Sequence, residues 1–204
     1  MARPKNSPEK ITRMRNAMMD AVVDLLDEVP PEKVSIRMIA EKIGVSHMVF
    51  YTYFKDRSEI MEALIERQQK RIDRHFEGLM EKAKRDSVND VLKTVLRDYA
   101  ETAHDHPKIF RLFWMTPEGS DAEKLDSIKH MEPTIRNIAE LLKMGMDKGE
   151  FAAKDPNLAA VVVLTLINAP IIMHQCGKMP FEVTCDQLLD EVVVSVLSYL
   201  VEGL

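Results

Sequence analysis

The sequence contains few of the residues that build disulfide-rich or turn-rich folds. Its 204 residues include two cysteines, Cys176 and Cys185, and only seven glycines. Two cysteines are too few for a disulfide framework, and their spacing does not fit a Cys-x-x-Cys metal site. We therefore expect both side chains to be reduced, partly buried thiols. The N-terminus has no apolar segment behind its basic residues, so we predict no secretory signal and a cytoplasmic location.

The signatures of common enzyme classes are absent. The chain has no Gly-x-Ser-x-Gly elbow, no phosphate-binding loop, no Gly-x-Gly-x-x-Gly fingerprint and no His-Glu-x-x-His zinc motif. His104 and His106 lie two residues apart, which places them on different faces of a helix, and the sequence offers no evident third ligand nearby. We therefore expect neither catalysis nor a metal site, and we predict no cofactor.

Long hydrophobic runs are scarce. The one extended apolar run covers residues 158–173, and Thr165, Asn168 and Pro170 interrupt it. A helix needs roughly 20 predominantly apolar residues to cross a bilayer. We therefore predict no membrane association.

Strand patterns are missing, whereas helix signals recur. No segment of four to eight residues alternates apolar and polar side chains between turn residues. Small polar residues followed by helical apolar spacing mark helix starts at Ser7 and Ser35. Asp56 with Glu59 resembles a capping box at the start of a long helix that reaches about residue 84. These signals predict an all-α fold of about nine helices.

Charge is distributed unevenly along the chain. Residues 1–57 carry ten Lys or Arg against eight Asp or Glu, whereas the remaining residues carry 18 against 25. The first fifteen residues hold five of the bases and one acid, Glu9. A basic arm of this kind commonly contacts phosphates or a minor groove, and a solvated terminus without a partner is an equally good interpretation.

Residues 35–54 have the pattern of a helix-turn-helix. Two helices that cross steeply need a small residue at their contact, a positive φ in the turn and an apolar residue after it. Ala40, Gly44 and Val45 occupy these places in order. A second helix beginning at Ser46 would then face a major groove. Any two short helices joined at a glycine share this pattern, so the segment alone does not establish DNA binding.

The residues after this segment make the pattern more specific. The motif Ile-Ala-x-x-x-Gly-Val-Ser at 39–46 is followed by Phe-Tyr-Thr-Tyr-Phe-Lys at 50–55 and then by the long helix. Over residues 8–66 the chain resembles the TetR family of bacterial repressors. The resemblance implies an N-terminal helix-turn-helix DNA-binding domain at 1–56 and a C-terminal effector-binding and dimerisation domain at 57–204.

The resemblance also implies roles for individual residues. Phosphate contacts would position the protein, and base contacts would come from the helix that begins at Ser46. The stretch His47-Met48-Val49 departs from the more usual Lys-Gly-Thr-like pattern and leaves this helix without Lys or Arg. Thymine methyl contacts by Val49 or Met48 then become an alternative to guanine recognition, and packing of Met48 against the domain is another. The implied phosphate contacts are Ser35, Arg37, Tyr51, Tyr53 and Arg57, and the implied base contacts are Ser46, His47, Val49 and Thr52. Lys55 is a further DNA-binding candidate.

An effector site in a helical bundle is lined by apolar and aromatic side chains with a few polar groups. Asn168 stands out, because an amide in an apolar segment needs a hydrogen-bond partner if it is buried. The apolar candidates are equally compatible with an ordinary core. We predict a hydrophobic effector, with ligand-binding candidates Tyr99, Phe110, Phe113, Trp114, Met115, Met144 and Asn168.

The last two predicted helices, at about 156–174 and 185–201, are apolar over more than one face. This favours a homodimer through these helices, with burial inside one chain as the alternative. A two-fold dimer would place recognition helices in successive major grooves. The predicted function is therefore a ligand-responsive repressor that binds a palindromic double-stranded operator and is released by a small molecule. The alternative is a TetR-like ligand-binding protein without sequence-specific DNA recognition.

Overall fold

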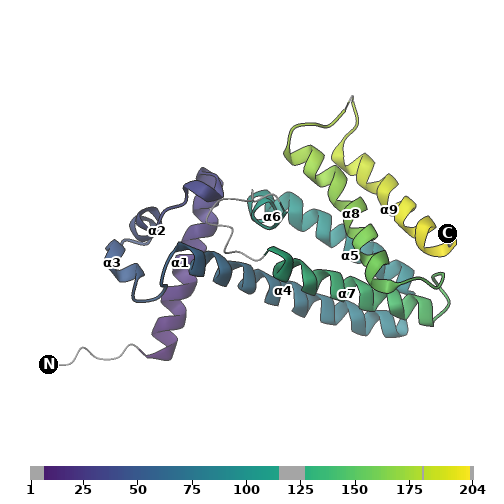
Figure 1. The fold of residues 1–204 in the computed structure, drawn as a ribbon, viewed down its shortest axis with the longest axis horizontal. Coiled ribbons are helices and arrows are strands. Elements are labelled where there is room, and N and C mark those ends of the chain that lie inside the picture. Colours follow the sequence, from purple (N-terminus) through teal and green to yellow (C-terminus); the bar gives the residue numbers. More distant parts are fainter. Residues whose placement is uncertain (1–6, 115–126, 181, 203–204) are drawn as a thin grey trace. The chain divides into compact units, whose positions relative to one another are not determined.

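All the regular secondary structure in the residues that the structure describes is helical. The computed structural model describes residues 7–114, 127–180 and 182–202, and these ranges hold nine α-helices, one short 3₁₀ helix and no strand (Figure 1). The predicted all-α fold is confirmed. The elements are α1 (Pro8–Glu28), η1 (Pro31–Lys33), α2 (Ile36–Lys42), α3 (His47–Phe50), α4 (Arg57–Arg85), α5 (Val88–Asp105), α6 (Pro107–Trp114), α7 (Ser127–Asp147), α8 (Pro156–Gln175) and α9 (Cys185–Glu202).

Side-chain caps explain where several helices begin. The hydroxyl oxygen of Ser35 accepts a hydrogen bond from the Met38 amide at 3.3 Å, at the start of α2. A carboxylate oxygen of Asp56 accepts one from the Glu59 amide at 2.9 Å, at the start of α4. Both caps satisfy amides that have no partner within the helix. Ser46 differs, because it precedes α3 but its side chain forms no capping hydrogen bond.

The chain divides into two compact units. The first contains residues 1–68 and 108–127, and the second contains residues 69–107 and 128–204. The division falls inside α4, which continues as one helix from the first unit into the second. The boundary predicted at residue 56 separates a DNA-binding domain from an effector-binding domain. Because it concerns function, it stays a prediction.

The core of the first unit joins α1, α2, α3 and the first half of α4. Met18 and Leu26 of α1, Ile39 of α2 and Phe50 of α3 are fully buried in it, and Phe54 lies beside them. The α2 helix packs against both α1 and α3. Because α3 is only four residues long, the burial of Phe50 sets which of its side chains face outward.

The core of the second unit is formed largely by α5, α7, α8 and α9. The α8 and α9 helices run antiparallel side by side, and α5 packs against both (Figure 1). Leu92 of α5, Leu142 of α7, Val163 of α8 and Leu200 of α9 are fully buried there. Polar groups inside this packed bundle therefore need hydrogen-bond partners.

The α8 helix corrects the argument that the apolar run at 158–173 is too short to cross a bilayer, whereas the absence of membrane association stays a prediction. It is 20 residues long, and a stretch of 18 residues within it has a mean hydropathy of 1.9, so its length and composition fit a membrane span. The core helix of a soluble protein meets the same criteria. The inner face of α8 is such a core face, since Ala159, Val163 and Ile167 are buried in the bundle.

Candidate DNA interface and sensor residues

The turn between α2 and α3 has the geometry expected of a helix-turn-helix. Gly44 adopts a φ of 70°, in the left-handed region that glycine enters without steric cost. The amide of Val45 donates a 2.9 Å hydrogen bond to the carbonyl of Ala40, and Ala40 is buried. The prediction for Ala40, Gly44 and Val45 is therefore confirmed. The chain leaves this turn at Ser46 with extended backbone and enters α3.

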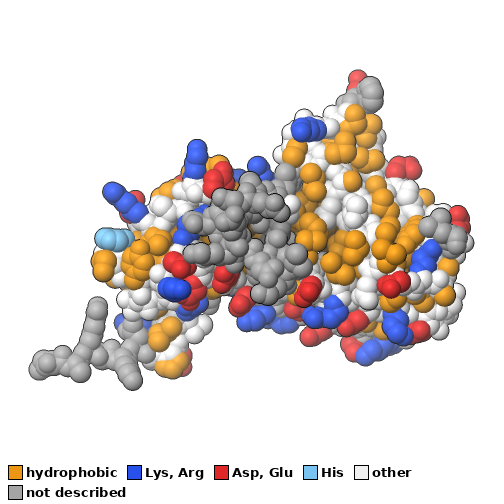
Figure 2. Space-filling model, viewed as in Figure 1, with side chains coloured by type: hydrophobic (Ala, Val, Ile, Leu, Met, Phe, Trp, Pro, Cys, Tyr) orange, Lys and Arg blue, Asp and Glu red, His pale blue; other side chains and the backbone are white. Residues whose placement is uncertain are grey.

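The α3 helix presents an apolar side chain to solvent. Met48 is 64% exposed, so the alternative that it packs against the domain is wrong. Ser46 and His47 are exposed as well, whereas Val49 is half-buried against the core of the first unit. Figure 2 shows hydrophobic side chains together with a histidine on the outer surface of α3. The exposed face thus offers a thioether and an imidazole.

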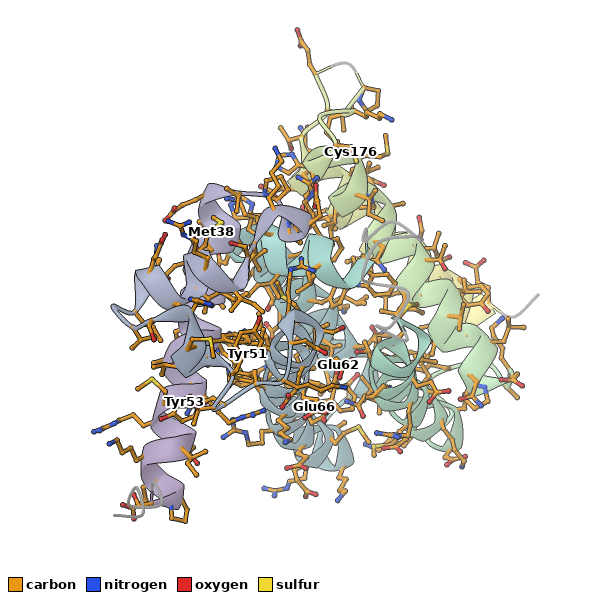
Figure 3. All side chains as sticks on the ribbon, turned by 60° about the vertical axis from the view of Figure 1, so that its left-hand side comes forward. Met38, Tyr51, Tyr53, Glu62, Glu66 and Cys176 are labelled. Carbon is orange, nitrogen blue, oxygen red and sulfur yellow. The ribbon has the colours of Figure 1, made fainter. Side chains whose placement is uncertain are left out.

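The two tyrosines after α3 occupy different environments. Tyr51 is 50% exposed and Thr52 beside it is exposed, whereas Tyr53 is 9% exposed and belongs to the core. Both tyrosines lie in the segment that leads from α3 to α4, and they are labelled in Figure 3. The Tyr51 side chain is therefore accessible to a DNA phosphate. The Tyr53 ring packs mainly against the core of the first unit.

The basic candidates differ in how they are engaged. Arg37 is exposed on α2 and forms a 2.7 Å ion pair with Glu41, one turn later. The hydrogen bond that Arg37 donates to the Glu41 carboxylate, aided by the negative charge of Glu41, raises the pKa of the Arg37 guanidinium. Arg57 is turned inward and donates to the carbonyls of Val34 and Pro31. Arg57 therefore ties α4 to the segment before α2.

Sequence reasoning missed one residue that organises this region. The guanidinium of Arg15 on α1 lies 3.9 Å from the centre of the Phe54 ring, and it donates to the Tyr53 carbonyl and to Glu59. Glu59 in turn accepts a 2.6 Å hydrogen bond from the amide of Lys55, whose side chain is exposed. Arg15 is 38 residues from Tyr53, so no local pattern could reveal the contact. The result is a fixed segment between α3 and α4.

Two of the sensor candidates meet in the second unit. The Tyr99 hydroxyl on α5 donates a 2.7 Å hydrogen bond to the side-chain oxygen of Asn168 on α8. Asn168 is 5% exposed and is buried within the bundle. The expected partner for a buried amide is therefore present. Met144 of α7 is half-buried against the same hydrophobic core.

The aromatic candidates of α6 belong to the first unit. The rings of Phe110 and Trp114 stack with their centroids 6.2 Å apart, and Phe110 is buried. The side chain of Phe113 and all of Met115 lie outside the described part of the chain. The structure thus brings Tyr99 together with Asn168, and Phe110 together with Trp114.

Metal-ligating side chains do not gather in the described ranges. Among these residues, no group of three or more His, Cys, Asp or Glu is placed to hold a metal ion. His75 instead forms a 2.7 Å hydrogen bond with Asp98, between α4 and α5.

This combination, a helix-turn-helix with an exposed recognition helix and an all-helical second unit, defines a helix-turn-helix transcription regulator. A family model of bacterial regulatory proteins of the tetR family matches residues 18–64, and a model of the tetracyclin repressor-like C-terminal domain matches residues 85–172. The chain belongs to the TetR family of transcriptional regulators. Its family and fold are those of regulators and not of enzymes.

Relatives share parts or all of this architecture. The nucleoid occlusion factor SlmA of Haemophilus ducreyi is 28% identical over 107 residues, which are 52% of this chain and 52% of that protein. The match thus spans about half the length of this curated relative. A putative TetR-family regulator from Syntrophomonas wolfei has a TM-score of 0.74 at 17% identity, covering 92% of this chain and 94% of the other. The regulator FadR from Bacillus subtilis, solved with stearoyl-CoA, has a TM-score of 0.69 at 19% identity, covering 93% and 98%.

Proposed function

We propose that this regulator binds a palindromic operator as a homodimer and is released from it by a small hydrophobic effector. The observation that carries the DNA-binding part is the outward face of the helix-turn-helix. His47 and Met48 on α3 and Tyr51 and Thr52 after it are all exposed, while Phe50 anchors the helix in the core. A short helix held in this way can enter a major groove as a rigid element. DNA binding implies a cytoplasmic location for the protein.

The outer face of α8 and α9 supports the homodimer. Leu158 and Val161 on α8 and Val194 and Val201 on α9 are exposed apolar side chains. Apolar patches of this kind on a helical hairpin are typical of a helix-on-helix interface. A two-fold dimer spaces its recognition helices roughly 34–36 Å apart, one turn of DNA. We propose that these four residues lie in the dimer interface.

The effector would bind to the bundle that holds Tyr99, Asn168 and Met144. Two polar atoms in an apolar core give a ligand one point of orientation, and the surrounding side chains supply apolar contact. Bacillus subtilis FadR was solved with stearoyl-CoA, and RolR with resorcinol, so both large and small apolar groups occur among proteins of this fold. We propose that α4 takes one position in the DNA-bound protein and another in the DNA-free protein. A ligand that binds more tightly to the DNA-free state would shift the population toward that state.

The test is fluorescence anisotropy with duplexes that cover the promoter of the protein's own gene and its neighbours. We expect tighter binding to one duplex than to a scrambled one, with an affinity that falls steeply with salt concentration because phosphate contacts release counterions. Tyr51→Ala should weaken binding, and Ile72→Ala, which truncates an exposed apolar residue of α4, should not. The titrations are made at a low and at a high salt concentration. Equal affinity for scrambled and promoter DNA at both would overturn the proposal.

The dimer and the effector have separate tests. Val194→Asp should shift the protein toward monomer in sedimentation velocity, and Ile72→Asp should leave it dimeric.

For the effector, compounds that raise the melting temperature of the protein are added to the protein–duplex complex. A compound that binds without lowering duplex affinity contradicts the release mechanism. If no duplex is preferred while an apolar compound still binds, the protein is a TetR-like ligand-binding protein without DNA recognition.

A further inference from the structure

The recognition face lacks the donors that read guanine. The described residues of α3 and of the turn before it include no Lys or Arg. The nearest basic side chains, on α2, form ion pairs within the chain. Arg37 pairs with Glu41 and Lys42 pairs with Glu28, each at 2.7 Å. Guanine is read most often by a bidentate pair from Arg or Lys, and the imidazole of His47 cannot form that pair. The usual guanine contact is thus missing from this face.

The same face carries an apolar side chain that the described residues of its own unit leave largely exposed. Successive residues of an α-helix are turned by about 100°, so Met48 points away from the direction of Phe50, two positions later. Phe50 is fully buried and Val49 is half-buried, and these contacts turn Met48 toward solvent. A 64% exposed methionine at the centre of α3 is therefore a fixed consequence of how the helix is anchored.

We propose that Met48 contacts the 5-methyl group of one thymine in each operator half-site, and that this contact selects the base pair there. The inference rests on the proposed operator binding. The thymine methyl is the one apolar group that a base pair presents in the major groove. Methionine suits it because the side chain is unbranched and the thioether is polarisable, so the side chain adapts to the position of the methyl group.

The experiment removes the methyl group alone. Duplexes that bind the full-length protein are enriched from a random-sequence pool, and each thymine of the enriched sequence is then replaced in turn by deoxyuridine, which lacks only the 5-methyl group. We expect one position per half-site at which the replacement weakens binding about fourfold, and about fifteenfold when both half-sites are changed. With Met48→Ala the enriched and the deoxyuridine duplexes should bind equally at that position. Ile72→Ala should retain the full difference.

The outcomes separate the inference from the function on which it rests. Failure to enrich any sequence overturns both. Enrichment of a sequence that tolerates deoxyuridine at every thymine overturns the Met48 contact and leaves operator binding intact. A loss at one thymine that persists in Met48→Ala also overturns the contact, because another group then reads the methyl. Since Met48 is exposed, truncation to alanine leaves the core intact, and an unchanged melting temperature of the variant checks this.

Discussion

The hydroxyl of Tyr99 on α5 donates a 2.7 Å hydrogen bond to the side-chain oxygen of Asn168 on α8. The amide is 5% exposed and lies in the most apolar of the described helices. A buried polar group without a partner costs free energy, and this hydrogen bond removes that cost for the amide oxygen. The pair therefore links α5 and α8 inside the hydrophobic core of the second unit.

Removing one partner of this pair should destabilise the protein more than removing both. Tyr99→Phe leaves the Asn168 oxygen buried without this donor, so we expect a loss of about 1–3 kcal/mol in the free energy of unfolding. The double variant Tyr99→Phe/Asn168→Leu should recover part of the loss, because two apolar groups then face each other. Urea unfolding at one fixed protein concentration measures both. Additive losses would mean that the two side chains do not interact energetically.

Releasing Arg37 should strengthen DNA binding. Glu41→Gln removes the carboxylate that holds the Arg37 guanidinium at 2.7 Å, in a depression that His47 and Ser46 also line. The freed guanidinium can then reach a phosphate. We expect a higher affinity for any duplex and a salt dependence that is steeper by about one released counterion. Arg37→Ala/Glu41→Gln should lose this gain. An unchanged salt dependence in Glu41→Gln would show that Arg37 does not contact DNA.

The Glu150 carboxylate should stabilise the fold in a pH-dependent way. Desolvation raises its pKa, but hydrogen bonds from the Val88 and Asn89 amides and from the Ser87 hydroxyl outweigh this effect, and the pKa lies below its usual range. A depressed pKa stabilises the folded state above the unfolded pKa of about 4.3, and this contribution is lost as the pH falls through the folded pKa.

We therefore expect Glu150→Gln to lower the free energy of unfolding at pH 7 by roughly 1 kcal/mol, as for the loss of a helix cap. The difference from the unsubstituted protein should shrink as the pH falls below the unfolded pKa and through the lower folded pKa of the carboxylate. Glu140→Gln on the exposed face of α7 is the matched control and should change little. Chemical denaturation across the pH series provides the comparison. A constant difference at every pH would contradict the role of the charge.

Gly145 should not tolerate a side chain. A Cβ atom at this position on α7 would overlap the ring of Phe151, which is buried in the core of the second unit. We expect Gly145→Ala to cost about 1–3 kcal/mol of stability, as overpacking in a core does. Gly78→Ala, in the interior of α4 with open space around it, should instead gain up to about 1 kcal/mol from helix propensity. Thermal unfolding of both variants decides this, and equal shifts would contradict the close packing.

Much of the helix-turn-helix could be predicted because its determinants are local. Ser35 and Asp56 cap their own helices, and Gly44 supplies the positive φ of its own turn. Asn168 could also be recognised as a group that needs a hydrogen-bond partner, because the residues on either side of it in the sequence are apolar. By contrast, the burial of Tyr53 and the exposure of Tyr51 could not be separated, because both residues match the same motif and lie two positions apart.

By itself, the sequence determined the helical class, the helix boundaries set by caps, and the family to which the chain belongs, because these depend on interactions between residues a few positions apart. Only the tertiary structure decided which basic side chains are engaged within the chain and which side chain meets Asn168. It turned Arg57 toward Val34 and Pro31, and it left Met48 exposed. These outcomes depend on contacts between residues that are distant along the chain, and on which face of each helix the core buries.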